Sequence, residues 1–384
     1  MAQQTPLAQG RYLVAAANCA GCHTAPDGRN LAGGVALETP FGIIYASNIT
    51  PDPETGIGRW TLDDFIRAMR QGIAADGMRL YPAFPYPSFT LISDGDLKLI
   101  WTYLRSVPPV HAAPRANALS FPFNLRALMT AWNALYLELG PYVPDPAKSA
   151  QWNRGAYLVQ GLGHCGACHT PHNALGAEMS RQVLAGGVYR DRVSANVTRN
   201  WSTPNITGAR SGLASWTVDD LARYLKTGHS ARAGSFGPMN EVITNSTAQL
   251  EDGDIRAIAV YLKDRAPAGA ADGGADAAAV SAGQTVYTLR CATCHLPDGR
   301  GDASTGPPLA GSAIVQAPDP ATLINVTLYG AEIPLPAPPD AWKSMEGFAA
   351  DLTDDDVAAL ATYLRASWGN SGNAVTSDQV ARQR

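Results

Sequence analysis

All six cysteines of this 384-residue chain fall into three pairs with the same spacing. Two residues separate the members of each pair, and a histidine follows at once, so the segments read CAGCH, CGACH and CATCH. They comprise Cys19, Cys22 and His23, then Cys165, Cys168 and His169, and then Cys291, Cys294 and His295. Because no cysteine lies outside this pattern, we expect no structural disulfide.

The C-x-x-C-H spacing is the signature of covalent attachment of a c-type haem. The two thiols add to the two vinyl groups on one edge of the porphyrin, and the adjacent histidine is held under the iron as its proximal ligand. A zinc site would pair such motifs or add distant histidines, and a thioredoxin-type motif would follow a strand of a βαβ unit. Neither alternative predicts three copies with histidine always in the fifth place. The motifs therefore predict three covalently bound haem c groups.

The sequence around the motifs also repeats. Gly10-Arg11-Tyr12 precedes the first motif and Gly155-Ala156-Tyr157 the second, while Gly283 stands before the third. Each repeat ends in a segment with apolar residues at helical spacing, such as Leu97, Ile100, Trp101 and Leu104. Tyr103, Tyr261 and Tyr363 hold equivalent places in these closing helices, and we expect them to serve core packing.

These repeats predict an all-α protein divided into three haem-binding domains. The expected ranges are a first domain at 1–108, a linker containing a helix at 109–150, a second domain at 151–266, a flexible linker at 267–282, a third domain at 283–370 and a polar tail at 371–384. Within the first linker, the apolar stretch from Asn124 to Leu139 predicts a helix that lies in a groove between domains or against a partner.

An electron-carrying haem generally has a second axial ligand, and methionine opposite histidine raises the reduction potential. Met239 and Met345 lie at matching repeat positions, in loops between the middle and closing helices, and are the predicted ligands of the second and third irons. The first repeat has no methionine in the corresponding window around Tyr81 to Phe84. We predict Met78 there, with Met129 or an open iron as the alternatives.

The other histidines are expected at the surface rather than on iron, and they are His111, His164, His172 and His229. Each proximal histidine needs an acceptor for its second ring nitrogen. Loop proline carbonyls are suitable candidates, namely Pro40, Pro204, and Pro307 or Pro308.

Haem attachment takes place outside the cytoplasm, so we expect a periplasmic protein, either free in that compartment or peripheral on the inner membrane. The first ten residues have neither a basic start nor an apolar run, so the export signal is expected to be missing from this sequence. The formal net charge of −4 argues against nucleic acid as a partner. No apolar run reaches the length of a transmembrane helix.

Together with the three motifs, several segments resemble the triheme cytochrome c subunits of bacterial periplasmic dehydrogenases. They are Trp-Thr-x-Asp-Asp at Trp60 and Trp216, Asn-Ile-Thr at Asn48 and Asn205, Leu-Tyr-Pro-Ala-Phe-Pro-Tyr at 80–86, and Ser-Trp-Gly-Asn at 367–370. The resemblance covers essentially the whole chain and implies three tandem class I cytochrome c domains. Many such relatives have methionine where Phe84 stands, which leaves the first iron's ligand in question.

The resemblance also implies a function. A separate catalytic subunit, of the molybdenum, flavin or quinone type, would oxidise an aldehyde, alcohol or sugar, and electrons would pass through the haems to ubiquinone or a terminal acceptor. The segment at 120–124 is most similar to members that accompany molybdenum-containing aldehyde dehydrogenases. No substrate-oxidising constellation is visible in this chain. The alternatives are a haem enzyme that uses an open first iron, and a free-standing periplasmic electron shuttle.

Overall fold

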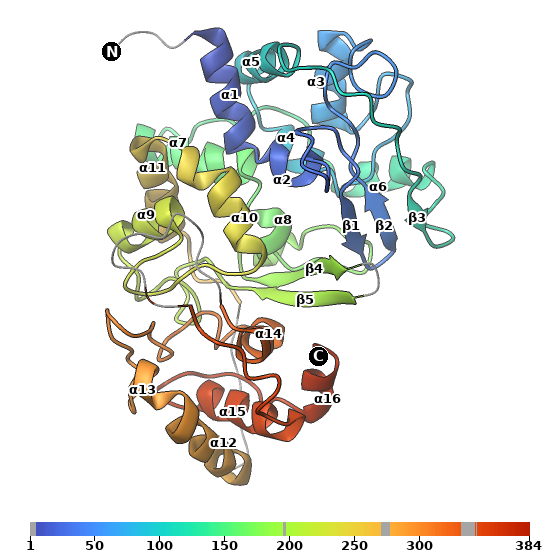
Figure 1. Ribbon diagram of the computed structural model, residues 1–384. Coiled ribbons are helices and arrows are strands. Elements are labelled where there is room, and N and C mark those ends of the chain that lie inside the picture. Colours follow the sequence, from blue (N-terminus) through green and yellow to red (C-terminus); the bar gives the residue numbers. More distant parts are fainter. Residues whose placement is uncertain (1–4, 195–196, 270–276, 332–341, 343) are drawn as a thin grey trace.

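The helices recur in three sets along the chain (Figure 1). The computed structural model describes residues 5–194, 197–269, 277–331, 342 and 344–384. Each set starts with a helix that leads into a C-x-x-C-H motif and ends with a helix that packs against the first one. These pairs are α1 (Pro6–Ala16) with α5 (Asp94–Leu104), α7 (Ala150–Tyr157) with α11 (Asp252–Lys263), and α12 (Ala277–Arg290) with α15 (Asp354–Ala366).

A glycine lies where the two helices of each pair cross. A Cβ atom on Gly10, Gly155 or Gly283 would approach a backbone oxygen of the closing helix to 2.2, 2.0 and 2.0 Å. In each crossing the added Cβ atom would also lie close to the Cβ of the repeated tyrosine, which is Tyr103, Tyr261 or Tyr363. The predicted packing role of these tyrosines is therefore confirmed, and only glycine allows the two helices to approach so closely.

Between the paired helices, each repeat holds a short motif helix and a middle helix. The motif helices are α2 (Cys19–His23), α8 (Gly166–His169) and α13 (Ala292–His295), and the middle helices are α3 (Leu62–Gln71), α9 (Val218–Thr227) and α14 (Ala321–Tyr329). Thr61 and Thr217 begin α3 and α9 with capping boxes formed with Asp64 and Asp220. The repeated Trp-Thr-x-Asp-Asp motif is therefore a helix start.

The remaining regular segments are short. They are α4 (Tyr86–Phe89), α6 (Leu128–Tyr136), α10 (Pro238–Asn245), α16 (Ser377–Ala381), the π turn η1 (Leu158–Leu162) and the 3-10 turns η2 (Ser180–Gln182) and η3 (Thr247–Gln249). The linker helix α6 is thus shorter than the predicted stretch from Asn124 to Leu139. Within the described part of the chain, no helix combines the length and the apolar composition that crossing a bilayer requires.

The prediction of an all-α fold is wrong, because the described residues also form two small antiparallel sheets. Strands β1 (Ala36–Thr39), β2 (Gly42–Tyr45) and β3 (Ala118–Leu119) make the first, with Ala36 opposite Tyr45. Strands β4 (Gly187–Ser194) and β5 (Val197–Thr203) make the second, with Gly187 opposite Thr203. Strands β1 and β2 and the hairpin of β4 and β5 occupy the long segments after the first and second haem motifs, while β3 lies in the first linker. Pairing satisfies the backbone polar groups that such long segments carry.

The hairpin of β4 and β5 crosses the middle of the molecule (Figure 1) and contacts elements of the first and third repeats. On one side β4 packs against β1, and Arg192 forms a 2.7 Å ion pair with Glu38. On the other side β5 packs against α14, where the Thr322 amide donates to Ser202 Oγ at 3.0 Å and the Thr322 hydroxyl donates to the Ser202 carbonyl at 2.8 Å.

The first two repeats contact each other reciprocally. The Tyr12 hydroxyl donates to Asp254 at 2.7 Å, and the equivalent Tyr157 donates to the equivalent Asp96 at 2.6 Å. Each tyrosine oxygen also accepts a backbone N–H at the start of the facing helix, from Glu251 at 3.2 Å and from Ser93 at 3.1 Å. This is the pattern of a twofold-symmetric dimer, here formed within one chain.

The apolar cores also group the first two repeats together and set the third apart. One core cluster contains residues of both the first and the second repeat, among them Leu97, Leu158 and Ile258. A second cluster, around Leu323, Val357 and Leu360, belongs to the third repeat. The exact domain boundaries proposed from the sequence stay predictions, and residues 270–276 of the second linker lie outside the described residues.

Candidate haem sites

The three motif histidines have matching backbone environments. The carbonyl of each accepts a hydrogen bond from a glycine N–H, from Gly33 at 2.6 Å, Gly186 at 2.8 Å and Gly301 at 3.0 Å. The segment that follows each motif therefore folds back onto the histidine that ends the motif. The repeated Leu-Ala-Gly-Gly sequence supplies this glycine in the first two repeats.

Nδ1 of each motif histidine contacts a backbone carbonyl oxygen. The distances are 2.6 Å from His23 to Ser47, 2.9 Å from His169 to Pro204 and 2.8 Å from His295 to Pro307. The predicted proline acceptors are confirmed in the second and third repeats and wrong in the first. Pro40 lies in the turn between β1 and β2, and Ser47, just after β2, takes its place. An N–H at Nδ1 leaves Nε2 of each ring as the free metal-binding nitrogen.

The charge states of these side chains suit a haem. Burial lowers the pKa of His23, His169 and His295, which keeps the imidazoles neutral as metal ligation requires. Burial raises the pKa of Cys19 to about 12 and that of Cys165 to about 11, so both side chains are neutral thiols while no group is attached to them. Within the described residues, no three His, Cys, Asp or Glu side chains gather as an ionic metal site would need.

The first and second motifs lie near each other. Burial and then the neighbouring Cys22 raise the pKa of Cys168 to about 12. Tyr189 on β4 lies close to both thiols, and burial, followed by the proximity of Cys168 and Cys22, raises its pKa. Helix α10, which carries Met239, packs against the first motif helix α2.

Met239 and Met345 pack against the same apolar cores as cysteines of the second and third motifs. Met239 lies in the first turn of helix α10 and not in the predicted loop, and it packs with Cys165 against the core shared by the first two repeats. Met345 packs with Cys291 against the core of the third repeat, and its backbone pairs with Ala331 just after α14. Their predicted roles as iron ligands stay predictions.

The first repeat places Phe84 where the second has Met239. The loops after α3 and α9 close with the same hydrogen bond, from the Leu80 amide to the Gly72 carbonyl and from the Ser235 amide to the Gly228 carbonyl, each at 2.7 Å. Four residues further along the chain stand Phe84 and Met239 respectively.

The two methionines weighed as alternatives for the first iron have different surroundings. Met78 lies at a turn and its side chain is 42% exposed. Met129, on α6, packs together with Phe84 against the small cluster of Tyr86, Trp132 and Ala177. These positions do not test whether either methionine binds the first iron, so Met78 stays the predicted ligand.

The comparisons with known proteins agree with this geometry. The model of the family described as "Cytochrome c" matches residues 7–108 and 280–368. A nicotinate dehydrogenase subunit from Pseudomonas putida is 45% identical over 369 residues, which are 94% of this chain but only 30% of that relative. The cytochrome c subunit of alcohol dehydrogenase (quinone) from Gluconobacter oxydans is 36% identical over 396 residues, 98% of this chain and 81% of the relative. The fructose dehydrogenase cytochrome subunit of Gluconobacter japonicus is 39% identical over 420 residues, 100% of this chain and 83% of the relative.

The chain belongs to the cytochrome c family. Membership implies covalently bound haem c, and the residues present fit it. The six cysteines of this cytochrome are free thiols, and the motif histidines hold neutral rings whose Nδ1 atoms are already engaged. Bound haem c supplies one-electron redox chemistry at its iron, and the protein sets the potential through axial ligands and burial.

Sequence reasoning missed a contact between the second and third repeats of the cytochrome. His229, expected at the surface, is only 3% exposed, and its ring lies 4.3 Å from that of Trp342. The Trp342 indole N–H donates to the Asp302 carbonyl at 3.0 Å. His229 belongs to the loop before Met239, and Asp302 to the turn after His295. In the sequence, His229 directly follows Gly228, the residue that ends helix α9, and this position was the available signal that His229 is buried.

The other histidines differ in exposure. His111 and His172 are exposed as predicted, and His111 lies 3.7 Å from Asp52. His164 is partly buried, and its ring lies 5.3 Å from Phe89 of the first repeat. It thus adds to the contact between the first two repeats.

Proposed function

We propose that this cytochrome carries three haem c groups and transfers electrons within a periplasmic dehydrogenase complex. It takes electrons from a catalytic subunit that oxidises an aldehyde, alcohol or sugar, and passes them to ubiquinone or a terminal acceptor. The observation that carries the proposal is the threefold recurrence of one arrangement. In each repeat a C-x-x-C-H helix follows a helix crossed at glycine, and Nδ1 of its histidine contacts a backbone carbonyl.

The packing of the repeats supports transfer of electrons between the proposed haems. Cys22 lies near enough to Cys168 to raise its pKa, so the first two haems would attach close together. Trp342 links the loop before Met239 to the turn after His295, which supports a short route between the second and third sites.

The relatives support a catalytic partner. Those reported above are named as subunits of nicotinate, alcohol and fructose dehydrogenases. The proposal for this chain is a partner of the same general kind, with a molybdenum, flavin or quinone cofactor. The periplasmic location is proposed because covalent haem attachment to C-x-x-C-H takes place after export.

Intact-mass spectrometry tests the haem count. The chain is produced with periplasmic export and a cytochrome c maturation system, and we expect a mass above that of the polypeptide by three haems. A variant with Cys291→Ser and Cys294→Ser should lose one of them, while Cys19 and Cys22 variants should lose a different one. A mass equal to the amino acids alone would refute the proposal.

A second candidate function is favoured by one observation, the presence of Phe84 at the place of Met239. A first iron without a methionine ligand would bind small molecules, as peroxidases and oxidases do. In that case the reduced protein would bind carbon monoxide at one haem in three. An absence of binding at every haem would exclude this function and leave electron transfer alone.

A further inference from the structure

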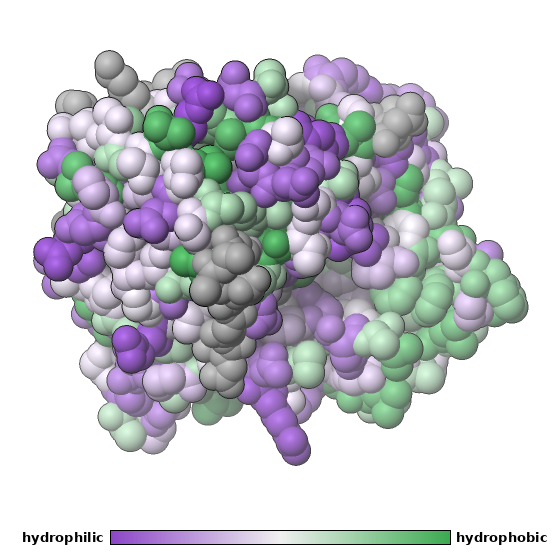
Figure 2. Space-filling view, turned by 90° about the horizontal axis from the view of Figure 1, so that it is seen from below, coloured by the Kyte–Doolittle hydropathy of each residue, from purple (hydrophilic) through white to green (hydrophobic). Residues whose placement is uncertain are grey.

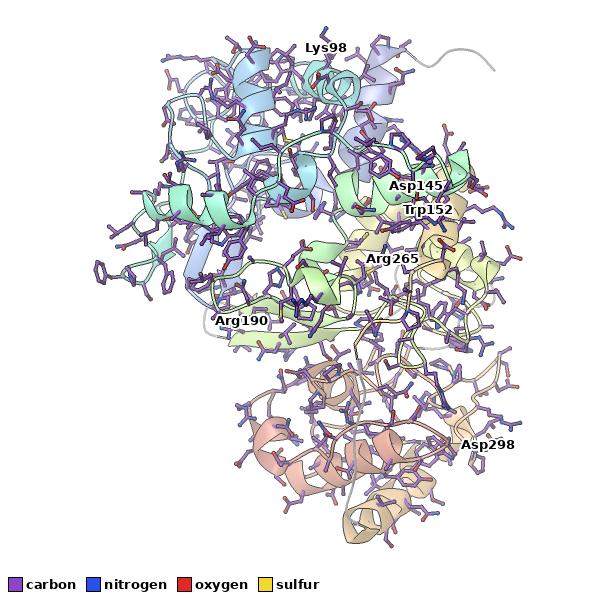
Figure 3. The ribbon with its side chains drawn as sticks, turned by 180° about the vertical axis from the view of Figure 1, so that it is seen from behind. Lys98, Asp145, Trp152, Arg190, Arg265 and Asp298 are labelled. Carbon is purple, nitrogen blue, oxygen red and sulfur yellow. The ribbon has the colours of Figure 1, made fainter. Side chains whose placement is uncertain are left out.

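The linker helix α6 lies between a loop of the first repeat and a turn of the second. A small buried cluster takes one residue from each of these three segments, namely Tyr86, Trp132 and Ala177. From behind, α6 stands at the side of the molecule, between the helices of the first repeat and the hairpin that carries Arg190 (Figure 3). We call residues 79–86 the Phe84 loop, because Phe84 stands in it at the place that Met239 has in the second repeat.

The end of the Phe84 loop is fixed by a hydrogen bond to α6. The buried Tyr86 donates from its hydroxyl to Asn133 Oδ1 at 2.6 Å, and Asn133 Nδ2 donates to the Gln71 carbonyl at 3.2 Å. A Cβ atom on Gly72 would lie 2.6 Å from the Tyr86 ring, so the ring packs directly on the backbone after α3. Asn133 thus joins the loop and the end of α3 at one point.

The start of the loop is held by the residue that precedes α6. Arg126 donates to the Arg79 carbonyl at 2.7 Å, and its guanidinium carbon lies 4.7 Å from the centre of the Tyr81 ring. The linker therefore contacts the Phe84 loop at both ends. Phe84 itself lies between these contacts and packs against the cluster that contains Trp132.

The hydrogen bonds of α6 determine which of its faces meets the loop. The helix reads LMTAWNALY, and Leu128 and Leu135 are exposed. In the view from below, hydrophobic surface gathers at the right-hand edge, on the side where Figure 1 shows β3 and α6 (Figure 2). Apolar contact is non-directional, so it does not select one face of such a helix. Trp132 and Asn133 make directional contacts and therefore set its rotation.

Trp132 extends the connection to the second repeat. Its indole N–H donates to the Leu175 carbonyl at 3.0 Å, in the turn that follows the second haem motif. Asn173 Oδ1 accepts from the amides of Leu175 and Ala177 at 2.9 and 3.1 Å, so this turn is itself well defined. The helix therefore ties the Phe84 loop to a structured turn beside the second motif.

The second repeat supports the corresponding position in another way. Met239 is part of α10, a helix of eight residues, whereas Phe84 precedes α4, a helix of four. The main-chain hydrogen bonds of a helix restrict the residues within it. Because Phe84 lies outside a helix, its position depends more on contacts with neighbouring segments, and α6 supplies these contacts.

We propose that α6 positions the Phe84 loop at the first haem site and fixes it relative to the second site. This inference rests on the proposed function, since it requires a haem attached to Cys19 and Cys22. Trp132 and Asn133 are positioning residues that act through the loop rather than on the haem. The proposal holds for Met78 as ligand and for an open first iron, because Met78 immediately precedes the loop.

Redox titration of the haem-loaded full chain, followed by visible and electron paramagnetic resonance spectra, tests the proposal. The first haem is the component that is missing when Cys19 and Cys22 are replaced by serine. Tyr86→Phe keeps the buried ring and removes the hydroxyl, so the loop loosens and admits water to the first haem. Water favours the more highly charged ferric state. We expect the ferric-to-ferrous ratio of this haem at a fixed potential to rise by about twofold or more, the least effect of one lost hydrogen bond. The other two haems should not change.

The matched control is another tyrosine of the same linker with the same type of bond. Tyr142 donates to Asn153 Oδ1 at 2.7 Å, away from the Phe84 loop, so Tyr142→Phe should leave the first haem unchanged. Asn133→Leu should reproduce the effect of Tyr86→Phe, and the double variant should add little, because both changes remove one bond. Trp132→Phe removes the bond to Leu175 and provides an independent test if the Tyr86 variant does not fold.

Intact mass and the thermal transition show that each variant is folded and loaded. A lower transition temperature with an unchanged first haem would mean that α6 serves stability alone, and this would overturn the proposal. An equal shift in Tyr142→Phe, or equal shifts of all three haems, would overturn it too. A wild-type chain without haem at Cys19 and Cys22 would refute the proposed function as well, and the mass reveals that before any titration.

Discussion

Met239 and Phe84 show how one residue changes the properties of a repeated site. The loops before them close with the same backbone hydrogen bond, and each residue stands four positions after that bond. A thioether can ligate iron and a phenyl ring cannot. The two repeats differ in this side chain and also in the backbone, since Met239 lies in α10 and Phe84 precedes α4.

We predict that Met239→Leu and Met345→Leu each turn one haem high-spin. Loss of the thioether ligand should lower the potential of that haem by roughly 0.1 V or more, a part of the roughly 0.8 V range that axial ligands span. Absorption spectra and redox titration measure both effects. Met69→Leu, a change in a buried core methionine, is the control. Unchanged spectra would refute the ligand assignment.

The reciprocal change at Phe84 should act in the opposite direction. We expect Phe84→Met to place a thioether beside the first iron, to raise its potential by roughly 0.1 V and to abolish any carbon monoxide binding there. Phe84→Leu controls for loss of the ring. Potentials and spectra identical to those of the wild type would show that position 84 does not face the iron.

At the scale of elements, each repeat depends on two helices that touch at a glycine. The Cβ that alanine would add at Gly283 lies 2.0 Å from the Ala359 oxygen and 2.6 Å from the Tyr363 Cβ, both in α15. Neither neighbour is the end of a flexible side chain, so the helices themselves must separate. The same geometry holds at Gly10 and Gly155, and the crossing is therefore a shared requirement of the three repeats.

Gly283→Ala should accordingly destabilise the third repeat by about 1–3 kcal/mol or more. Gly253→Ala is the matched control, since its Cβ would meet no atom within 4 Å in the first turn of α11. We expect that variant to be neutral, or more stable by about 0.5–1 kcal/mol. Denaturant unfolding of the two proteins measures the difference, and equal midpoints would contradict the close crossing.

At the scale of the whole molecule, the cytochrome combines a paired unit with an attached third one. The first two repeats share a core and exchange equivalent tyrosine–aspartate hydrogen bonds, whereas the third repeat has its own core. The hairpin of β4 and β5 contacts both neighbours, through Arg192 and Glu38 on one side and Ser202 and Thr322 on the other. The second repeat is therefore the structural centre.

The contact between the first two repeats should weaken in acid. Burial opposes ionisation of Asp254, but hydrogen bonds from Arg154 and Tyr12 outweigh it and hold the pKa of this carboxyl below its ordinary value. The ionised Asp254 therefore contributes its full stabilisation above the ordinary carboxyl pKa of about 4. That stabilisation is lost as the pH falls through the lowered pKa of Asp254. The free energy of unfolding should fall in that acidic range.

Asp254→Asn should remove this part of the acid dependence and destabilise the protein by about 1.5–3 kcal/mol at neutral pH. The control is Asp219→Asn, whose ion pair with Arg256 is exposed and worth about 0–1 kcal/mol. Unfolding curves across the acidic range provide the measurement. An acid dependence equal to that of the wild type would show that Asp254 does not hold the repeats together.

The sequence by itself determined the features that depend on neighbouring residues. The three C-x-x-C-H motifs and the repeated glycine and tyrosine that stand at the helix crossings could be predicted from local spacing. Two of the three carbonyl acceptors were also predicted, from their positions in the repeats. These depend on covalent spacing and on helical periodicity, which a chain carries locally.

Only the tertiary structure decided the features that depend on residues far apart in the chain. It formed the two sheets, placed Ser47 rather than Pro40 against His23, buried His229 beneath Trp342, and left Leu135 exposed on a helix that we expected to be covered. Each of these outcomes is set by which surfaces of the repeats meet. Local sequence patterns do not encode that choice, because the same apolar stripe can pack against several partners or against none.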